Sequence, residues 1–432
     1  MSTLEDIYTG ALRLLAPATP LLARGNGKLA QGIRGRRDAV EHLEGWARAE
    51  RDRSRPLVWF HAPSVGEGLQ ARAVLTSLLE LLPQVQTAYT YFSPSAVAFA
   101  NRIPAGVTGY LPIDLPEQMD RCIRALHPSA IVFSKTEIWP NLTRAAEAHH
   151  VPLLLLSATL PESSSRLRQP TRALLAASHQ RLYRVGAISA EHARRFERLG
   201  VSRRSIAVTG DARFDQVAQR ARGVDRSSEL LRGLAAPGSV TVVAGSTWAE
   251  DETHLVNALA AARTAGSSIR AIMAPHEPGE DHLLELEKRL DEQQLPHRRL
   301  ADRPSAEGAE VILIDRVGIL GDLYALADIA YVGGGFGTAG IHSVLEPAAF
   351  GTPVLFGPRH SNAREAAELV ASGGAFEVRS TRELTDQLGR LAGDDAFRRA
   401  TGERAQTYVD AGLGAAERSA RLILLAMEER EK

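Results

Sequence analysis

The segment HAPSVGEG, residues 61–68, places a carboxylate where it could act on a bound ligand. It follows the apolar run LVWFH (residues 57–61), which predicts a strand, and it precedes a stretch with helical spacing. Ser64 and Gly66 permit a tight turn between the two elements, so Glu67 falls at the start of the helix, where the helix dipole favours a negative charge. A carboxylate held in this way suits a general base. The structural alternative is an acid that only caps its helix.

The most informative stretch is glycine-rich: VGGGFGTAGIHSVLEPAAFGTPVLFGP, residues 332–358. After a predicted strand, Gly333–Gly335 would let another group approach the backbone closely. A helix is expected near His342 and Ser343, with Ser343 as its N-cap, and free N–H groups at such a start bind phosphate. Glu346, one turn later, could accept hydrogen bonds from ribose hydroxyls. The spacing is neither a P-loop nor a GxGxxG motif, and the alternative is a turn that only packs on the sheet.

Four shorter segments carry polar side chains at the ends of predicted strands: MAPHEP (273–278), DRVGIL (315–320), SKTEIWPN (134–141) and GDARFD (210–215). His276 could face a phosphate or a base, and Gly318 could let the backbone contact a flat base. Lys135, near Glu137, and Arg213 could bind a sugar carboxylate or a phosphate. For each of these segments the alternative is an ordinary turn or a surface ion pair.

Short β-rich runs alternate with helical stretches along the chain, as parallel α/β layers require. The predicted strands cover residues 57–61, 87–92, 130–134, 153–157 and 185–189 in a first series, and residues 241–244, 270–274, 311–314, 329–332 and 353–356 in a second series. The polar stretch 217–238 between the two series is interpreted as a linker. The pattern predicts two doubly wound domains that bind ligands at the carboxyl ends of their strands, in a cleft between the domains.

Length and composition set outer limits on the function. A chain of 432 residues suggests two domains of about 200 residues each. Its formal net charge of 0 creates no global field that would attract nucleic acid, which is therefore not an expected partner. The single cysteine, Cys122, excludes an intrachain disulfide, and the sequence offers no Cys/His cluster for zinc, which fits a reducing cytoplasm.

The N-terminal segment combines an apolar part with a basic part. Glu5 and Asp6 stand where a secretory signal would carry positive charge. The apolar stretch 8–23 is interrupted by an arginine and two prolines and is shorter than the ~20 residues that cross a bilayer. Basic residues then follow from position 24 to position 37 with no acid among them. Such a segment could dock on anionic lipid, and a solvated helix surface is an equal alternative.

In their order along the chain, these segments resemble the signatures of the bacterial transferases that move 3-deoxy-D-manno-octulosonic acid (Kdo) from CMP-Kdo onto lipid A precursors. The blocks that carry the resemblance are HAPSVGE, TYFSPSA, YLPIDLP, KTEIWPNL, GDARFD, AGSTWAEDE, APHEP, DRVGILGDLY and the VGGGF to VLFGP stretch. The resemblance implies the GT-B fold, in which two Rossmann-like doubly wound domains face an interdomain cleft. Residues 1–216 would bind the acceptor, residues 217–238 would be the linker, and residues 239–432 would bind the CMP-sugar.

The resemblance also implies roles for particular residues in an inverting transfer. Glu67 matches the base that deprotonates the acceptor hydroxyl, and Lys135 and Arg213 match groups that stabilise the transition state. The residues that match CMP-contacting segments are Pro275, His276, Val317, Gly318, Ile319, Ser343, Val344, Leu345 and Glu346. The family's usual Pro-Arg-His is Pro275-His276-Glu277 here, so the phosphate contacts differ in detail.

No cofactor and no metal are implied, because basic side chains and backbone N–H groups can stabilise a monophosphate leaving group. The implied partners are CMP-Kdo, a lipid A precursor and an anionic membrane surface, with peripheral or monotopic attachment at the cytoplasmic face of the bacterial inner membrane. Another GT-B enzyme, such as a UDP-sugar transferase or epimerase, would equally explain the glycine-rich loop and Glu346. A non-catalytic nucleotide- or lipid-binding protein on the same fold would not require Glu67.

Overall fold

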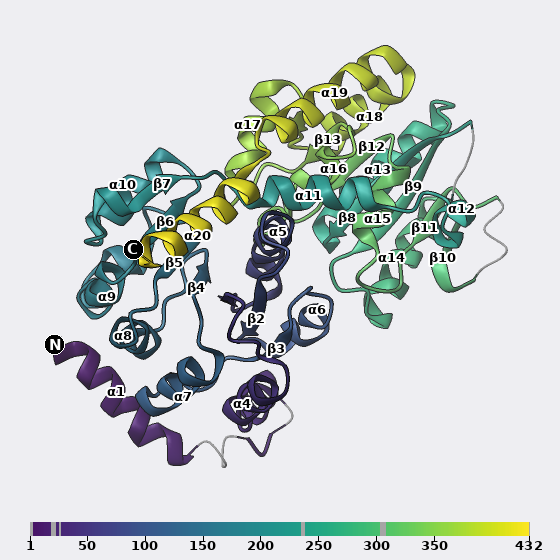
Figure 1. Cartoon of the computed structure of the whole chain (residues 1–432). Coiled ribbons are helices and arrows are strands. Elements are labelled where there is room, and N and C mark those ends of the chain that lie inside the picture. The colour runs from purple at the N-terminus through teal and green to yellow at the C-terminus, as the bar shows by residue number, and fades with distance from the viewer. Residues whose placement is uncertain (1–2, 19–22, 26, 235–237, 303–307, 432) are drawn as a thin grey trace. The chain divides into compact units, whose positions relative to one another are not determined.

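The computed structural model describes residues 3–18, 23–25, 27–234, 238–302 and 308–431. The chain forms two compact units: Met1–Gln216 with Leu413–Lys432 is the first unit, and Val217–Gly412 is the second unit. Each unit is built on one parallel sheet of seven strands with helices against it (Figure 1). The predicted fold class, two doubly wound α/β domains, is confirmed.

The first sheet consists of β1 (Leu57–His61), β2 (Gln86–Tyr91), β3 (Val107–Tyr110), β4 (Ala130–Ser134), β5 (Leu153–Ala158), β6 (Arg184–Ala187) and β7 (Ile206–Val208). The strand order is β3-β2-β1-β4-β5-β6-β7. The chain thus runs outward from β1 to β3 and returns on the other side of β1 with β4, where Val58 pairs with Ala130. The carboxyl ends of β1 and β4 form the switch point at which doubly wound sheets bind ligands.

The second sheet repeats this plan. It consists of β8 (Val240–Thr247), β9 (Ile269–Pro275), β10 (His297–Arg299), β11 (Val311–Leu313), β12 (Ile329–Val332), β13 (Val354–Phe356) and β14 (Ala375–Glu377). The strand order is β10-β11-β9-β8-β12-β13-β14. The chain crosses from one side of β8 to the other when it enters β12, so the carboxyl ends of β8 and β12 form the second switch point.

The strands that the sequence did not predict are the edges of the two sheets: β3, β7, β10 and β14. An edge strand pairs on one side only, so it needs no continuous apolar run. Val208 in β7 is 53% exposed, and β10 reads His-Arg-Arg. The pattern of buried residues on which the strand prediction relies is therefore missing at the edges.

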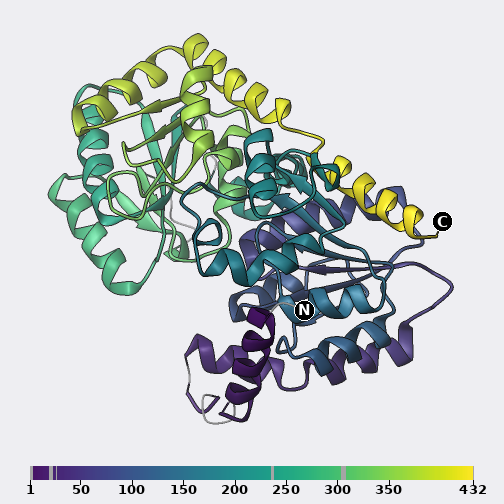
Figure 2. The same ribbon diagram turned by 90° about the vertical axis from the view of Figure 1, so that its left-hand side faces the viewer.

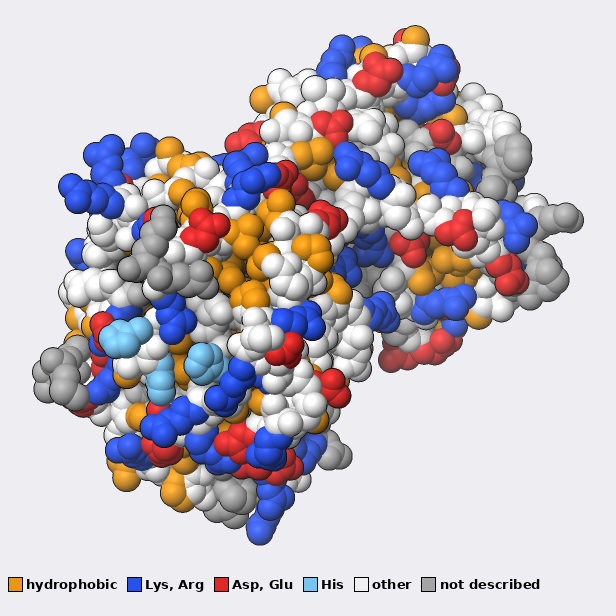
Figure 3. Space-filling view, viewed as in Figure 1, with side chains coloured by type: hydrophobic (Ala, Val, Ile, Leu, Met, Phe, Trp, Pro, Cys, Tyr) orange, Lys and Arg blue, Asp and Glu red, His pale blue; other side chains and the backbone are white. Residues whose placement is uncertain are grey.

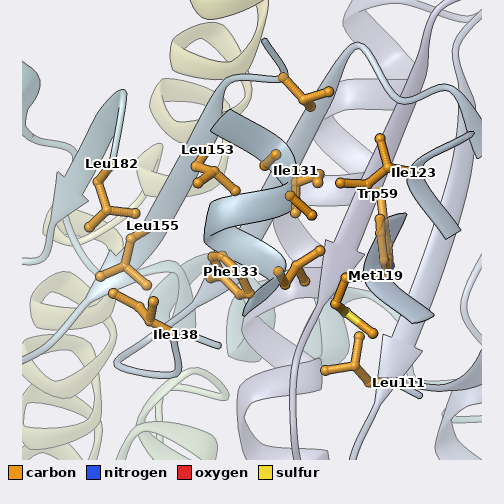
Figure 4. Close-up of a cluster of buried hydrophobic side chains, with 14 of the residues drawn as sticks. Trp59, Leu111, Met119, Ile123, Ile131, Phe133, Ile138, Leu153, Leu155 and Leu182 are labelled. Carbon is orange, nitrogen blue, oxygen red and sulfur yellow. The ribbon is translucent and has the colours of Figure 1, made fainter. Parts of the chain in front are cut away.

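The helices of the first unit are α1 (Thr3–Leu15), α3 (Lys28–Arg36), α4 (Ala39–Glu50), α5 (Val65–Leu81), α6 (Val97–Ala100), α7 (Pro116–Leu126), α8 (Pro140–Ala148), α9 (Thr171–Gln180), α10 (Ala190–Arg198) and α20 (Ala415–Glu431), and α11 (Ala212–Gly223) leads into the second unit. Neighbouring strand residues face opposite layers. Trp59 packs with Leu43 of α4 and Met119 of α7 (Figure 4), whereas Phe60 packs with Leu75 of α5. Both faces of the first sheet are therefore buried.

The helices of the second unit are α12 (Glu229–Leu234), α13 (Ala249–Thr264), α14 (Glu280–Glu292), α15 (Leu320–Leu323), α16 (Leu345–Ala348), α17 (Arg364–Ser372), α18 (Thr381–Gly393) and α19 (Asp395–Ala411). Leu231 and Leu234 of α12 are buried in the core beneath the second sheet. The stretch 217–238, expected as a linker, thus contributes helix and core to the second unit; its residues 235–237 lie outside the described chain.

The last helix, α20, belongs to the first unit, although the expected second domain, 239–432, included it. The carboxylate of Asp215 accepts hydrogen bonds from the backbone N–H groups of Gly414 (2.7 Å) and Ala416 (2.9 Å) at its N-terminal end. Ile423 and Met427 then bury their side chains in the layer formed with α5. Figure 1 and Figure 2 both show α20, in yellow, against the first unit.

The N-terminal helix α1 is fastened to the first unit by polar contacts. The carboxylate of Glu5 is 1% exposed and lies 2.6 Å from the guanidinium of Arg181. Tyr8 donates a hydrogen bond to Asp114 (3.1 Å), and Thr9 donates one to Asn141 (2.8 Å). Across the described ranges, no helix combines the length and the apolar character needed to cross a membrane.

Two adjacent acids of α1 test this attachment. Glu5→Gln should lower the free energy of unfolding by roughly 3 kcal/mol, because it removes one partner of a buried ion pair. Asp6→Asn is the matched control: Asp6 pairs with Arg144 at 2.9 Å but is 50% exposed, so its loss should cost at most ~1 kcal/mol. Urea unfolding, with hydrogen exchange in α1, measures both, and equal effects of the two substitutions would contradict a buried anchor.

Candidate active site

The switch point of the first sheet brings together two residues singled out from the sequence. Glu67 lies in the first turn of α5, which follows β1, and Lys135 follows β4 directly. The Lys135 Nζ is 3.6 Å from the Glu67 Oε1, with the two side chains 43% and 18% exposed. The hydroxyl of Ser64 donates a hydrogen bond to the same carboxylate. Glu67 is thus a partly shielded anion that ligands can still reach.

The backbone holds Lys135 in an uncommon conformation. Its φ angle is +67°, in the left-handed region that a residue with a side chain rarely adopts. The Lys135 N–H donates to the Leu156 carbonyl (2.9 Å), and the Lys135 carbonyl accepts from the Thr159 N–H (3.1 Å). Conformations of this kind cluster at functional sites, where the surrounding structure stabilises them.

A second carboxylate, Glu137, lies close enough to Glu67 for the charge of Glu67 to affect its pKa. Burial raises the pKa of Glu137, the guanidinium of Arg166 at 3.4 Å partly offsets that rise, and the charge of Glu67 adds to it. The sequence placed Glu137 at a strand end without giving it a role. The electrostatic interaction between Glu137 and Glu67 depends on the conformation of the loop after β4. The spacing of residues along the sequence could not predict it.

His61 joins two of the sequence motifs. Its ring is fully buried; Nδ1 lies 3.1 Å from the Thr90 hydroxyl, and Nε2 accepts a hydrogen bond from the Trp139 indole (3.1 Å). Burial lowers the pKa of His61 to about 3, so the ring is neutral. His61 therefore ties HAPSVGEG to SKTEIWPN without supplying charge. The sequence had given no role to His61, although it begins the first motif.

Arg213, expected to stabilise the transition state, is engaged within its own loop. Its Nε and Nη2 donate to the Asp211 carboxylate at 2.9 and 2.8 Å, and its backbone N–H donates to the same group at 3.0 Å. The guanidinium is 40% exposed. The structure thus places a fixed positive charge at the start of α11, and its catalytic role stays a prediction.

In the second unit, the glycine-rich loop packs on the protein itself. A Cβ at Gly333 would collide with the Ser246 carbonyl, and one at Gly335 would lie 2.6 Å from the Gly357 nitrogen. The absence of a Cβ at these glycines therefore makes room for neighbouring backbone. This matches the packing alternative for these three residues rather than direct contact with a ligand.

The buried carboxylate of Asp251 fixes the same loop. It accepts hydrogen bonds from the backbone N–H groups of Gly334 (2.7 Å) and Phe336 (3.3 Å) and from the hydroxyl of Tyr331 (2.8 Å). It also accepts from the Trp248 N–H (3.0 Å) at the start of α13. Two N–H groups of the glycine-rich loop are thus already used. Sequence reasoning missed Asp251, which belongs to the AGSTWAEDE block.

The helix expected near His342 differs from the prediction. Helix α16 begins at Leu345, has only four residues, and is preceded by Val344 with no side-chain cap. Ser343 is exposed and is not the N-cap. The expected helix start with Ser343 as its N-cap was therefore wrong, because the chain from Gly333 to Val344 is an irregular loop with no regular helix. A phosphate contact of this segment stays a prediction.

Glu346 lies in α16 and is partly buried. Burial raises the pKa of Glu346, and the guanidinium of Arg220 partly offsets this rise. The charge of Glu346 also contributes to the raised pKa of the buried Tyr324, after the larger contribution of burial. Glu346 thus interacts electrostatically with Arg220 of α11 and with the buried Tyr324.

The remaining predicted contact residues end β9 and follow β11. His276 comes directly after Pro275, and its ring lies 4.5 Å from the ring of His342, so the structure brings these two loops together. Gly318 has a φ angle of +93° with open space where a Cβ would project, and Val317 beside it is 75% exposed. The turn at Gly318 therefore presents backbone to solvent. No group of three or more His, Cys, Asp or Glu among the described residues could hold a metal ion.

Known proteins resemble this chain in sequence and in fold. Residues 39–216 match the family described as "3-Deoxy-D-manno-octulosonic-acid transferase (kdotransferase)". The chain is 30% identical to the 3-deoxy-D-manno-octulosonic acid transferase of Bordetella pertussis, over 96% of this chain and 97% of that protein. Among solved structures, a glycosyltransferase from Rickettsia africae has a TM-score of 0.58 at 12% identity and covers 88% of this chain and 99% of its own. A UDP-GlcNAc 2-epimerase from Neisseria meningitidis has a TM-score of 0.60 at 12% identity, over 87% of this chain and 100% of its own. These solved structures share the GT-B fold.

The packing role of the loop glycines can be tested without any ligand. Gly335→Ala should destabilise the nucleotide-free protein by about 1–3 kcal/mol, because its Cβ would overlap the backbone of Gly357. Gly389→Ala is the control in the same unit: it lies within α18 with no atom within 4 Å of a new Cβ, so it should be neutral or stabilise by up to ~1 kcal/mol. Urea unfolding compares the two. Wild-type stability of Gly335→Ala together with lost nucleotide affinity would instead indicate that the glycine serves the ligand.

Proposed function

Because the chain belongs to the family of 3-deoxy-D-manno-octulosonic-acid (Kdo) transferases, we propose that it moves Kdo from CMP-Kdo to a lipid A precursor in lipopolysaccharide biosynthesis, with inversion at the anomeric carbon. As a member of this family it is a glycosyltransferase. The observation that carries the proposed mechanism is the Glu67–Lys135 pair at the switch point of the first sheet. A UDP-sugar transferase or epimerase would share the fold, but the sequence relationship over 96% of the chain favours Kdo transfer.

Glu67 acts in this proposal as the general base. Its carboxylate accepts the proton of an acceptor hydroxyl, whose oxygen then attacks the anomeric carbon of Kdo. The bond between that carbon and the phosphate oxygen breaks, and CMP leaves with the electron pair. The start of α5 and the ammonium of Lys135 place positive charge beside this carboxylate. Lys135 also offers positive charge to the Kdo carboxylate, and Arg213 remains a candidate for the same task.

The second unit binds the CMP moiety in this proposal. Glu346 would accept hydrogen bonds from the ribose hydroxyls, and the turn from Val317 to Ile319 would lie against the base. Burial of Glu346 and the open backbone of Gly318 support these two roles. His276, at the end of β9, would face the phosphate.

The N-terminal segment would attach the enzyme to the membrane that carries its lipid acceptor. Leu14 and Leu15 at the end of α1 are 83% and 60% exposed, and Leu29 in α3 is 68% exposed. Hydrophobic, basic and acidic side chains lie side by side in the lower part of the space-filling view, where α1 ends (Figure 3). Residues 19–22 of the predicted apolar stretch lie outside the described chain.

The arginines of the basic segment differ in their exposure and in their contacts with described residues. Arg36 lies over the ring of Phe92 at 3.6 Å, and burial lowers its pKa to about 10. Arg34 donates to two backbone carbonyls. Arg24 and Arg37 are exposed, and both line a pocket of about 480 Å³ together with Ala16, which follows Leu15 in the chain. We therefore assign the electrostatic contact with anionic lipid at the cytoplasmic face of the inner membrane to Arg24 and Arg37.

The role of the base is tested by Glu67→Gln, which keeps the shape of the side chain but removes its basicity. Turnover should fall by roughly 10²–10⁴-fold, while CMP affinity stays the same. Glu80→Gln, at an exposed position of the same helix, is the control and should keep full activity. Turnover is measured with CMP-Kdo and a lipid A precursor, with the product weighed by mass spectrometry. Near-normal turnover of Glu67→Gln would remove Glu67 from the mechanism.

Membrane attachment is tested with a double substitution of Arg24 and Arg37 to Ser. Binding to anionic vesicles should weaken by up to ~1 kcal/mol per charge, and binding to neutral vesicles should change little. The same change at Arg203 and Arg204, two exposed arginines elsewhere in the first unit, removes equal charge and should leave binding intact. Vesicle sedimentation measures both variants. Equal losses would mean that net charge alone, and not this segment, governs the binding.

A further inference from the structure

A pocket of about 340 Å³ lies at the amino edge of the first sheet, away from the candidate active site. Its lining includes Arg53, which precedes β1, Pro128, which precedes β4, and Val151, which precedes β5. Glu67 follows the other end of β1, so the five residues of that strand separate the two edges, which is about 17 Å of extended chain. The pocket is therefore a separate feature of the first unit.

The lining of this pocket is mainly basic. Arg53 follows α4, Arg124 belongs to α7 and Arg430 belongs to α20, so three distant segments each contribute one guanidinium. His127 and His149 complete the polar part of the lining. In the space-filling view, histidine side chains lie among basic and acidic ones around α8 (Figure 3). Guanidinium groups keep their charge at every physiological pH, so the pocket gathers three fixed positive charges.

Little negative charge balances these arginines. Among the described residues, the carboxylate that pairs with the lining is that of Asp120, which lies 2.8 Å from the Arg124 Nε and 2.7 Å from the His149 Nε2. Within the described chain, the Arg53 guanidinium forms no hydrogen bond or ion pair. Three positive charges thus meet one negative charge, and their mutual repulsion is unfavourable in the empty pocket. A bound anion would remove this repulsion.

The helix ends at this edge do not account for the arginines. Basic side chains often cap the last carbonyls of a helix, and α7 and α8 both end here. The carbonyls of Leu126 and His127 at the end of α7 already accept from Arg51, at 2.8 and 3.2 Å. At the end of α8, the Val151 N–H donates to the Ala146 carbonyl (2.8 Å). Capping of these two helices therefore leaves the lining arginines unexplained.

The shape and the floor of the pocket fit a small phosphorylated molecule. Arg430 donates its Nη1 to the Pro128 carbonyl (3.4 Å), and a guanidinium carries five N–H donors, so this contact leaves most of them for a ligand. The planar fork of these donors matches the oxygens of a phosphate. Ile123 and Val151 are buried and give the lining an apolar part. The volume falls at the lower end of the ~300–1,000 Å³ range of small-molecule sites.

We infer that this pocket binds the phosphate group of a phosphomonoester, at a site separate from the candidate active site. Arg53, Arg124 and Arg430 would contact the phosphate oxygens, and Ile123 and Val151 would contact the apolar remainder of the ligand. The same phosphate group could belong to a soluble compound or to a lipid headgroup. The inference is independent of the proposed function, because it uses no residue of that mechanism.

The test measures binding of glycerol 3-phosphate by calorimetry in a buffer of low ionic strength that contains no phosphate or sulfate. Arg53→Gln should weaken binding roughly tenfold, because it removes charge-assisted hydrogen bonds to the phosphate. Its melting temperature should stay that of the wild-type protein, since Arg53 has no partner among the described residues. Arg430→Gln, from a distant segment, should give a similar loss. Arg203→Gln, an exposed arginine elsewhere in the first unit, removes equal charge and should bind as tightly as the wild-type protein.

Three outcomes would overturn the inference: no binding by the wild-type protein, wild-type affinity of Arg53→Gln, or equal losses in Arg53→Gln and Arg203→Gln. Sedimentation with vesicles that contain phosphatidic acid then distinguishes the two sources, because this lipid carries the same glycerol phosphate on acyl chains. Weaker vesicle binding of Arg53→Gln would assign the site to a lipid headgroup. Unchanged vesicle binding, together with the loss of glycerol 3-phosphate affinity, would assign it to a soluble compound. Kdo transfer is measured separately, so its failure would contradict the proposed function and not this site.

Discussion

The parallel pairing of β1 with β4, and of β8 with β12, is the constraint on which both candidate sites depend. Parallel strands end at the same edge of a sheet, and a chain that crosses from one side of its first strand to the other leaves space at that edge. Glu67 and Lys135, distant in sequence, meet at 3.6 Å because each follows one strand of such a pair. Trp248 and His342 follow β8 and β12 in the same way, and the ring of His276 lies 4.8 Å from that of Trp248 and 4.5 Å from that of His342.

Buried polar side chains then set the precise shape of the loops at these edges. Neutral His61 accepts from the Trp139 indole and so fixes the loop that carries Lys135 and Glu137 to the one that carries Glu67. Asp251 has the same role in the second unit, where its carboxylate accepts hydrogen bonds from the start of α13 and from the glycine-rich loop. In a low-dielectric interior, leaving such groups unpaired is costly, so a fully bonded network holds one loop conformation. Motifs that are separate along the sequence are therefore joined in pairs by hydrogen bonds.

The N-terminal segment shows how one helix can serve two tasks. Glu5, Tyr8 and Thr9 use their polar groups to fasten α1 to the first unit. The same helix leaves Leu14 and Leu15 exposed at its end, and Ala16, the next residue in the chain, lines a pocket with Arg24 and Arg37. Large exposed apolar side chains are unfavourable in water and gain free energy when they enter a lipid interface. Firm attachment of α1 would let a membrane contact orient the whole first unit.

The sequence by itself determined the α/β class, the central strands and the position of Glu67, because buried strands such as LVWFH and IAYV carry continuous apolar runs and the HAPSVGEG turn has its own local signature. It did not determine the edge strands, since β10 (HRR) is paired on one side only and needs no apolar pattern. It also misplaced α20, whose attachment to the first unit depends on the distant carboxylate of Asp215. Only the tertiary structure decided that the loop glycines lie against neighbouring backbone, that α16 is short, and that three aromatic rings lie close together at the strand ends. Each of these outcomes depends on contacts between segments far apart in the chain, and local residue patterns carry no information about such contacts.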